Sequence, residues 1–237
     1  ERVFYKSLPN IHIGKLPIML RSCICVLEQY KHLAPEVSGE CYMDPGGYFV
    51  VNGSEKTCLG QERAAENQIQ CFNIARTSSR WAWMAEIKSV PSDKCISPKQ
   101  VSLLRASKAT CSGFGLWLQL PRMKGPVPLF CVFRALGVLS DRAICELITH
   151  DSSAENQMLD ELEASAAEGA SWMTQDEAID HITTMALYTP INMDRETGAI
   201  RKRAFTVDVL NKDLFPHCDT LEQKINFLGM MADRLLK

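Results

Sequence analysis

The sequence lacks the patterns that mark several large classes of protein. None of its apolar runs reaches 18 residues, so no membrane-spanning helix is expected. Charged residues stand at the N-terminus where a secretory signal peptide would have its apolar core, so we expect no signal peptide. The formal net charge is only −2, so the 237-residue chain as a whole is neither strongly basic nor strongly acidic. A start at Glu1 rather than Met is what we expect of a piece of a longer protein.

Motifs that would make a self-contained active site are missing as well. The sequence has no Gly-x-x-x-x-Gly-Lys phosphate loop and no Gly-x-Gly-x-x-Gly turn. The acidic pairs Asp160-Glu161 and Asp176-Glu177 fall near the N-termini of expected helices, where they complement the helix dipole and are predicted to be structural. His217 is expected to cap or pack rather than to catalyse. We therefore predict no catalytic residue, no metal ligand and no cofactor in this chain.

Ten cysteines are many for a chain of this length, but none forms a Cys-x-x-Cys pair. The nearest approach is Cys23-x-Cys25, which would be only half of a zinc site because no second pair follows at ligand spacing. We interpret the cysteines as free thiols that pack as small apolar side chains in a reducing compartment. A zinc-binding regulator remains the weaker alternative.

Charge is distributed unevenly along the chain. Residues 81–150 carry nine Lys or Arg against four Asp or Glu, a balance of +5, and residues 151–198 carry one Arg against eleven acidic residues, a balance of −10. The basic part is suited to nucleic acid or an acidic neighbour. The acidic part either faces a basic partner or is the solvated side of surface helices, and the second explanation is slightly favoured.

Hydrophobic periodicity predicts a mixed α+β fold, with strands early and helices late. We expect residues 13–27 to be extended, residues 58–74 to form a helix, residues 121–128 to form a loop and residues 195–198 to form a turn or loop. The other expected elements are strands over 81–87, 116–120 and 129–133, and helices that begin near Ser140, Ser152, Thr174 and Thr220. The last three start sites have the spacing of a capping box.

Three large side chains have two interpretations each. Trp81 and Trp83 are expected on one face of a strand, where core packing is favoured over a platform for stacked bases. Arg134 follows a run that looks buried, so it is expected to bond to an internal carboxylate or to backbone carbonyls rather than to nucleic acid.

The most informative stretch is DPGGYFVVNGSEK, residues 44–56, which continues into Gly60-Gln61-Glu62-Arg63. Pro-Gly-Gly predicts a tight reversal and Tyr-Phe-Val-Val a short strand. Asn52-Gly53 predicts a second tight turn, because both residues tolerate a positive φ. The polar residues that follow are then presented at the mouth of the turn. Physical chemistry alone therefore predicts a rigid loop that carries a cation, Lys56.

The amino-acid sequence of this loop resembles that of the second-largest subunit of multisubunit DNA-dependent RNA polymerases, in its eukaryotic polymerase II form. Three further blocks are similar to the same family and occur in its order: IGKLPIMLRS at 13–22, PLFCVFRALGVLSDR at 128–142, and LFPH with FLGMMADRLL at 214–217 and 227–236. Residues 91–115 and 152–203 match it poorly.

The resemblance implies an α+β fold in two parts, with residues 1–79 as the end of the domain called the protrusion and residues 80–237 as the domain called the lobe. In the family these domains form one wall of the DNA cleft. The resemblance also implies that Lys56 contacts a phosphate of the RNA–DNA hybrid, followed by Gln61 and Arg63 on the next turns of the expected helix.

The implied activity is DNA-directed RNA synthesis by the whole polymerase, with Mg²⁺ held by aspartates that lie mostly in the largest subunit. Implied partners are the largest and other core subunits, DNA, the RNA–DNA hybrid and initiation factors that dock on the lobe. The implied location is the nucleus, or a cytoplasmic factory or virion if the source is a large DNA virus. The alternative is a stand-alone protein-interaction module with a lobe-like fold.

Overall fold

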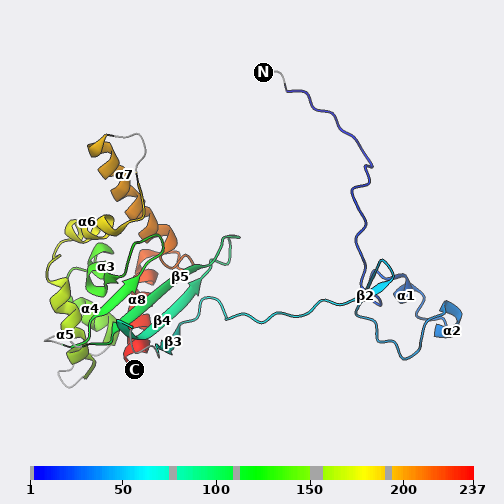
Figure 1. Ribbon diagram of the computed structural model, residues 1–237, viewed down its shortest axis with the longest axis horizontal. Helices are drawn as coiled ribbons and strands as arrows, with labels where there is room; N and C mark the ends of the chain where they lie inside the picture. Colours follow the sequence, from blue (N-terminus) through cyan, green and yellow to red (C-terminus); the bar gives the residue numbers. More distant parts are fainter. Residues whose placement is uncertain (1–2, 75–78, 109–112, 150–156, 190–193) are drawn as a thin grey trace. The chain divides into compact units, whose positions relative to one another are not determined.

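The computed structural model describes residues 3–74, 79–108, 113–149, 157–189 and 194–237. The chain divides into two compact units, Glu1–Arg63 and Ala64–Lys237. They are called unit 1 and unit 2 below, and each is considered by itself (Figure 1). The assignment of residues 1–79 to a protrusion end and of residues 80–237 to a lobe stays a prediction.

The described residues of unit 1 form two single-turn helices and one hairpin. The helices are α1 (Val26–Gln29) and α2 (Pro35–Ser38), and the hairpin joins β1 (Phe49–Val51) to β2 (Ser54–Lys56). Residues 11–19 form neither helix nor strand, which agrees with the expected extended segment, but the end of that segment enters α1. The helix predicted over residues 58–74 is wrong. Residues 57–69 have no regular structure, because their side chains mostly stay exposed and no apolar face is buried to hold a helix.

Unit 2 is built on a five-stranded antiparallel sheet in which neighbouring strands follow one another in the chain, β3-β4-β5-β6-β7. Their bounds are β3 (Gln70–Asn73), β4 (Trp81–Ser89), β5 (Lys99–Ala106), β6 (Leu116–Gln119) and β7 (Val127–Pro128). The predicted strands over 81–87 and 116–120 are confirmed. Val127–Pro128 was predicted as loop and instead forms a short edge strand, a position where the missing proline N–H is tolerated.

Helices form much of the remaining described part of unit 2. They are α3 (Leu129–Ala135), α4 (Asp141–Thr149), α5 (Gln157–Gly169), α6 (Gln175–Met185), α7 (Arg195–Asp208), the π-helical turn η1 (Val209–Asp213) and α8 (Leu221–Leu236). In Figure 1 the strands of the sheet lie side by side with these helices around them. None of the helices in the described residues is both long enough and apolar enough to cross a membrane. The mixed α+β fold class is as predicted.

One face of the sheet makes the core. Alternate strand residues such as Ile87, Leu103 and Leu118 are 0–1% exposed, as the period of two requires for a face covered by other elements. Helix α8 contacts β4 and β5, and α3 contacts β6 and β7. Helix α8 also packs closely on α4, because the position a Cβ would take at Gly229 lies 2.5 Å from the carbonyl oxygen of Leu147.

Helix starts are where sequence signals worked best. Thr174 and Thr220 both close complete capping boxes, with Glu177 and Gln223 bonding back to the backbone of the cap residue. Helix α4 begins at Asp141, as predicted. The capping box predicted at Ser152 lies outside the described residues. The turn predicted over residues 195–198 is wrong, because these residues form the first turn of α7 behind Asp194.

Candidate nucleic-acid contact surface

The hairpin of unit 1 presents Lys56 on a short rigid support. Asn52 and Gly53 have φ values of 51° and 78°, the left-handed pair that a tight hairpin turn needs. In the register of the two strands Phe49 lies opposite Lys56 and Val50 lies opposite Glu55. Directly opposed residues share a face and neighbours in a strand do not, so Lys56 and Glu55 point to opposite faces.

The base of the hairpin is tied to the chain before it. Asp44 accepts a hydrogen bond from the backbone N–H of Gly46 at 2.9 Å and another from the hydroxyl of Tyr48 at 2.5 Å. The hydrogen bond from Tyr48, followed by that from Gly46, lowers the pKa of Asp44, and the same bond to Asp44 raises the pKa of Tyr48 to about 12. Gly46 has a φ of 70°, and a Cβ there would lie 2.8 Å from the carbonyl oxygen of Leu20. Glycine is therefore required at this position.

The three residues predicted to contact nucleic acid lie in one exposed run of chain. Every side chain from residue 52 to residue 65 is exposed. Among the described residues no ion pair is formed with Lys56, so its charge is not neutralised by a neighbour. Gln61 and Arg63 follow in irregular structure, so the helix expected to carry them is wrong, and Arg63 already has an interaction of its own. Binding by any of the three stays a prediction.

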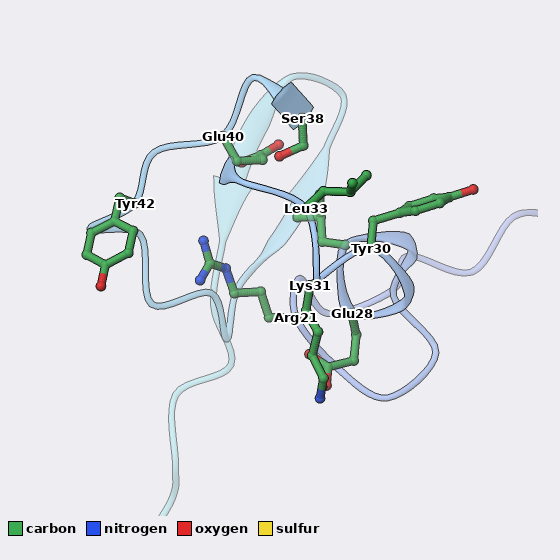
Figure 2. Close-up of a pocket in the computed structure, with 9 residues that line it drawn as sticks. Arg21, Glu28, Tyr30, Lys31, Leu33, Ser38, Glu40 and Tyr42 are labelled. Atoms are coloured by element: carbon green, nitrogen blue, oxygen red, sulfur yellow. The ribbon is translucent and has the colours of Figure 1, made fainter. Parts of the chain in front are cut away.

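A pocket of about 240 Å³ in unit 1, lined by both charged and apolar side chains, was not predicted from the sequence. Arg21 contributes to its wall, and Figure 2 shows the guanidinium of Arg21 pointing toward the side where Tyr42 lies, whereas the ring of Tyr30 points the other way. Lys31 and Glu28 pair at 2.6 Å beside it, which raises the pKa of Lys31. Because its lining carries charges of both signs, the pocket is suited to a polar side chain rather than to a phosphate chain.

Charged side chains inside unit 2 are paired within the fold. Arg134 is fully buried in α3 and donates to the carbonyl oxygens of Gly169 and Trp172, and it also pairs with Asp141. The internal role predicted for Arg134 is confirmed. The strand predicted around it is wrong, because residues 129–135 form a helix that is buried on all sides, a pattern that periodicity does not separate from a buried strand.

Three of the four side chains of the acidic pairs, and His217, have contacts within the fold. Glu161 pairs with Arg105 at 2.8 Å, Asp176 pairs with Arg203, and Glu177 closes its capping box. His217 lies 2.6 Å from the hydroxyl of Ser89 and packs edge-on against Phe227, and burial lowers its pKa.

A second buried cation fixes the π-helical turn. Lys224 is 4% exposed and donates to the carbonyl oxygens of Asn211 at 2.5 Å and of Leu214 at 2.7 Å. Burial lowers the pKa of Lys224. Asp213 lies in the same turn and pairs with Lys99 at 3.3 Å and with Arg122 at 3.2 Å. With a third contact to the carbonyl oxygen of Leu210, these hydrogen bonds use the donors of the Lys224 ammonium group within the fold.

Trp81 and Trp83 do not form the same-face pair that the sequence predicts. The strand register shifts between them, so Trp81 lies opposite Ala106 and its ring contacts Trp117 at a centroid distance of 6.2 Å. The guanidinium of Arg80 lies over both of those rings, at 4.9 and 5.1 Å. Trp83 is 40% exposed, so the core position expected for it is wrong.

Comparison with known proteins shows which protein family the chain matches. The family model described as RNA polymerase beta subunit matches residues 5–237. The chain is 36% identical over 233 residues to the DNA-directed RNA polymerase II subunit RPB2 of Schizosaccharomyces pombe, which covers 96% of this chain and 18% of that protein. It is 36% identical over 231 residues to the subunit of the same name from Encephalitozoon cuniculi, which covers 96% of this chain and 19% of that protein.

A more distant relative is the DNA-directed RNA polymerase subunit Rpo2 of Saccharolobus solfataricus, which is 30% identical over 211 residues and covers 89% of this chain and 17% of that protein. The chain thus spans about a fifth of the length of the curated relatives it matches.

Proposed function

This chain belongs to the RNA polymerase beta subunit family, and from that premise we propose that it is part of the second-largest subunit of a DNA-directed RNA polymerase of the polymerase II type. The observation that carries the proposal is the match of almost the whole chain to this family, together with the names of its relatives. On this proposal the chain contributes to RNA synthesis on a DNA template in a eukaryotic nucleus. Its partners are the largest and other core subunits, with initiation factors docking on unit 2.

The chemical step belongs elsewhere in the assembly. Nucleotidyl transfer uses divalent metals held by clustered carboxylates. Among the described residues no group of three or more His, Cys, Asp or Glu could hold a metal ion, so these residues do not fit the Mg²⁺ of the polymerase. We therefore assign this chain a role in shape and charge, and no catalytic step.

Within that role, Lys56 is proposed to contact a backbone phosphate of the RNA–DNA hybrid. Its exposure, its unpaired charge in the described structure and its fixed direction on the hairpin support this assignment. A phosphate contact adds affinity without reading base sequence. Gln61 and Arg63 are proposed as weaker contacts along the same exposed run.

The membership test uses the parent gene with an affinity tag in its native host. Purification should recover the largest polymerase subunit and template-dependent RNA synthesis with Mg²⁺. Recovery of the tagged protein without polymerase subunits or RNA synthesis would refute the proposal and favour the stand-alone interaction module.

The site test measures elongation-complex lifetime against potassium concentration in the assembled polymerase. Lys56→Ala should lower the salt slope by about one, because one fewer counterion is released on binding. Lys56→Arg keeps the charge and should keep the slope, and Lys31→Ala removes an exposed charge that is already paired with Glu28 and should leave the slope unchanged. Equal slopes for Lys56→Ala and wild type would show that Lys56 is only a solvated charge.

A further inference from the structure

The five-stranded sheet of unit 2 has a second face that the core does not use. On the inner face Ala85, Leu103 and Leu118 lie opposite one another on successive strands and are each 0% exposed. Residues one position away along each strand point to the other side, which is called the outer face below. Among the described residues, no apolar side chain of the outer face belongs to the core cluster or packs against it. The outer face is therefore a surface of its own.

An apolar row crosses four strands of the outer face. Phe72 of β3 lies opposite Met84 of β4, and Met84 lies opposite Leu104 of β5. Leu104 in turn lies opposite Trp117 of β6. Phe72 is 44% exposed, Met84 and Trp117 are half-buried, and Leu104 lies between larger neighbours at 8%. A continuous row of apolar side chains on an open face indicates a binding surface.

Two indole rings and a guanidinium group lie together at the β6 end of this row. The ring of Trp81 contacts that of Trp117 at a centroid distance of 6.2 Å, and the guanidinium of Arg80 lies over both rings at 4.9 and 5.1 Å. The rings fix the direction of Arg80, which is exposed and forms no ion pair within the described part of the chain. Its acidic neighbour is Glu168, whose pKa is raised by burial against the opposing charge of Arg80. A planar cation held on an aromatic ring keeps donors for a phosphate group.

A polar row runs beside the apolar row on the outer face. Gln70 lies opposite Glu86, and Ser102 lies opposite both Glu86 and Gln119. Side-chain amides and hydroxyls both donate and accept hydrogen bonds. Lys88 is exposed and lies two positions beyond Glu86 on the same face of β4. The apolar row is therefore only one residue wide, and hydrogen-bonding groups lie directly beside it.

We propose that the outer face of the sheet binds a single strand of DNA, with bases stacked on the aromatic side chains of the apolar row and a phosphate held by Arg80. Neighbouring strands are about 4.8 Å apart, so the row is about 14 Å long, the length of about four stacked nucleotides. The inference rests on the proposed function for the source of the strand. RNA synthesis on one strand of a DNA duplex leaves the other strand without a partner, and its bases are then free to stack on protein.

Two properties favour nucleic acid over a protein partner. The centre of a protein–protein interface is typically a patch depleted of charge, whereas this row is narrow and has amide and charged groups at its side. Aromatic faces with a guanidinium are what single-stranded nucleic acid stacks on, without a fixed base sequence. Arg80 and Lys88 against Glu86 give these three outer-face residues a positive balance, which complements a phosphate backbone.

Fluorescence anisotropy of a labelled oligothymidylate of about 12 nucleotides measures binding to the 237-residue chain. The single strand should bind at least about tenfold more tightly than a duplex of the same length, because paired bases cannot stack on the row. Trp117→Leu keeps an apolar side chain but removes the aromatic face, and should weaken binding at least about fivefold. Trp117→Phe keeps an aromatic face and should weaken binding by less than about twofold. No binding of the single strand, or equal binding by wild type and Trp117→Leu, would overturn the proposal.

Trp83 supplies the matched control. It is 40% exposed but lies opposite Arg105, in the register of the inner face, so Trp83→Leu should leave binding of the oligonucleotide unchanged. Arg80→Gln should lower the slope of log affinity against log salt by about 0.7, because one phosphate contact to a single strand is lost. Equal losses in Trp83→Leu and Trp117→Leu would refute a site on the outer face, as would an unchanged slope in Arg80→Gln. Circular dichroism checks that each variant is folded.

The source of the strand is tested in the assembled polymerase, on a DNA bubble that carries RNA on one strand. With 5-iodouracil in the unpaired DNA strand, irradiation should crosslink that strand to Trp81 or Trp117, as located by mass spectrometry. Crosslinks from the RNA alone, or from neither strand, would overturn the assignment to DNA. Purification of the tagged protein without polymerase subunits would count against the proposed function, whereas failure of the 237-residue chain to bind oligothymidylate counts against the outer face alone.

Discussion

Replacement of Arg134 by methionine should be among the most damaging single changes in unit 2. The side chain is fully buried, and its guanidinium donates to the carbonyl oxygens of Gly169 and Trp172 and pairs with Asp141. Methionine fills the space of the stem but leaves both carbonyls without a donor. Each buried polar group that loses its partner costs about 1–3 kcal/mol, which gives about 2–6 kcal/mol for the two.

The net loss is expected near the low end of that range. Removal of the guanidinium also relieves the cost of burying a charge, which is several kcal/mol in a protein interior. The free energy of unfolding should therefore fall by about 3 kcal/mol, which is a large part of the total for a domain of this size.

The Asp141→Asn variant measures the contribution of the ion pair to stability separately from that of the two carbonyl contacts. The side chain of Asp141 is 45% exposed, and asparagine keeps an oxygen that can accept from Arg134, so this change should cost less than about 1 kcal/mol. Urea unfolding followed by circular dichroism measures both variants against wild type. A loss below 1 kcal/mol for Arg134→Met, or equal losses for both variants, would contradict the view that the carbonyl contacts dominate.

Three further predictions concern packing, acid stability and thiols. Gly229→Ala should lower the unfolding free energy by about 1–3 kcal/mol through its clash with α4, whereas Gly60→Ala, which has no atom within 4 Å of the new Cβ, should change it by less than about 0.5 kcal/mol in the same urea titration. Hydrogen bonds from Thr174 lower the pKa of Glu177, so Glu177 stabilises the fold above its unfolded pKa, and this stability is lost as pH falls through the lowered pKa. The difference in unfolding free energy between wild type and Glu177→Gln should therefore shrink below about pH 4.5. A difference that stays constant with pH would contradict this. Burial raises the pKa of Cys131 to about 12, so a thiol reagent at neutral pH should label the exposed cysteines first and Cys131 only after unfolding, when all ten should react without reductant.

Local signals in the sequence predicted the elements whose cause is local. The turn at Asn52-Gly53 depends on two residues that accept a positive φ, and the helix starts at Thr174 and Thr220 depend on a hydroxyl and a partner three residues later. The α+β fold class followed from hydrophobic periodicity and the family from the four sequence blocks, and the internal role of Arg134 followed from its apolar surroundings.

Elements that depend on tertiary burial were mispredicted. The run from residue 129 to residue 135 is apolar at nearly every position, so it has no period to separate helix from strand, and its helical form is set by packing between β6, β7 and α6. The segment from residue 58 to residue 69 has helix-forming residues but no apolar face that another element covers. The separation of Trp81 from Trp83 results from a one-residue shift in strand register, which no sequence period reports.

For the candidate site, the sequence located the hairpin and Lys56 but placed Gln61 and Arg63 on a helix that does not form. The pocket at Arg21 escaped prediction because its lining comes from separated positions between residues 21 and 42. Such a pocket depends on how loops fold back on one another, so no fixed spacing of residues in the sequence predicts it.

The order of the strands in unit 2 also governs how the unit is made. Each strand from β3 to β7 pairs with the next one in the chain, so the sheet needs only short loop closures and can form early, while synthesis is still in progress. Its inner face at β4 and β5, however, is covered by α8, the last element of the unit. During synthesis on the ribosome the apolar face of the sheet is therefore exposed until α8 has emerged. The docking of α8 therefore buries apolar surface that is prone to aggregation while it is exposed.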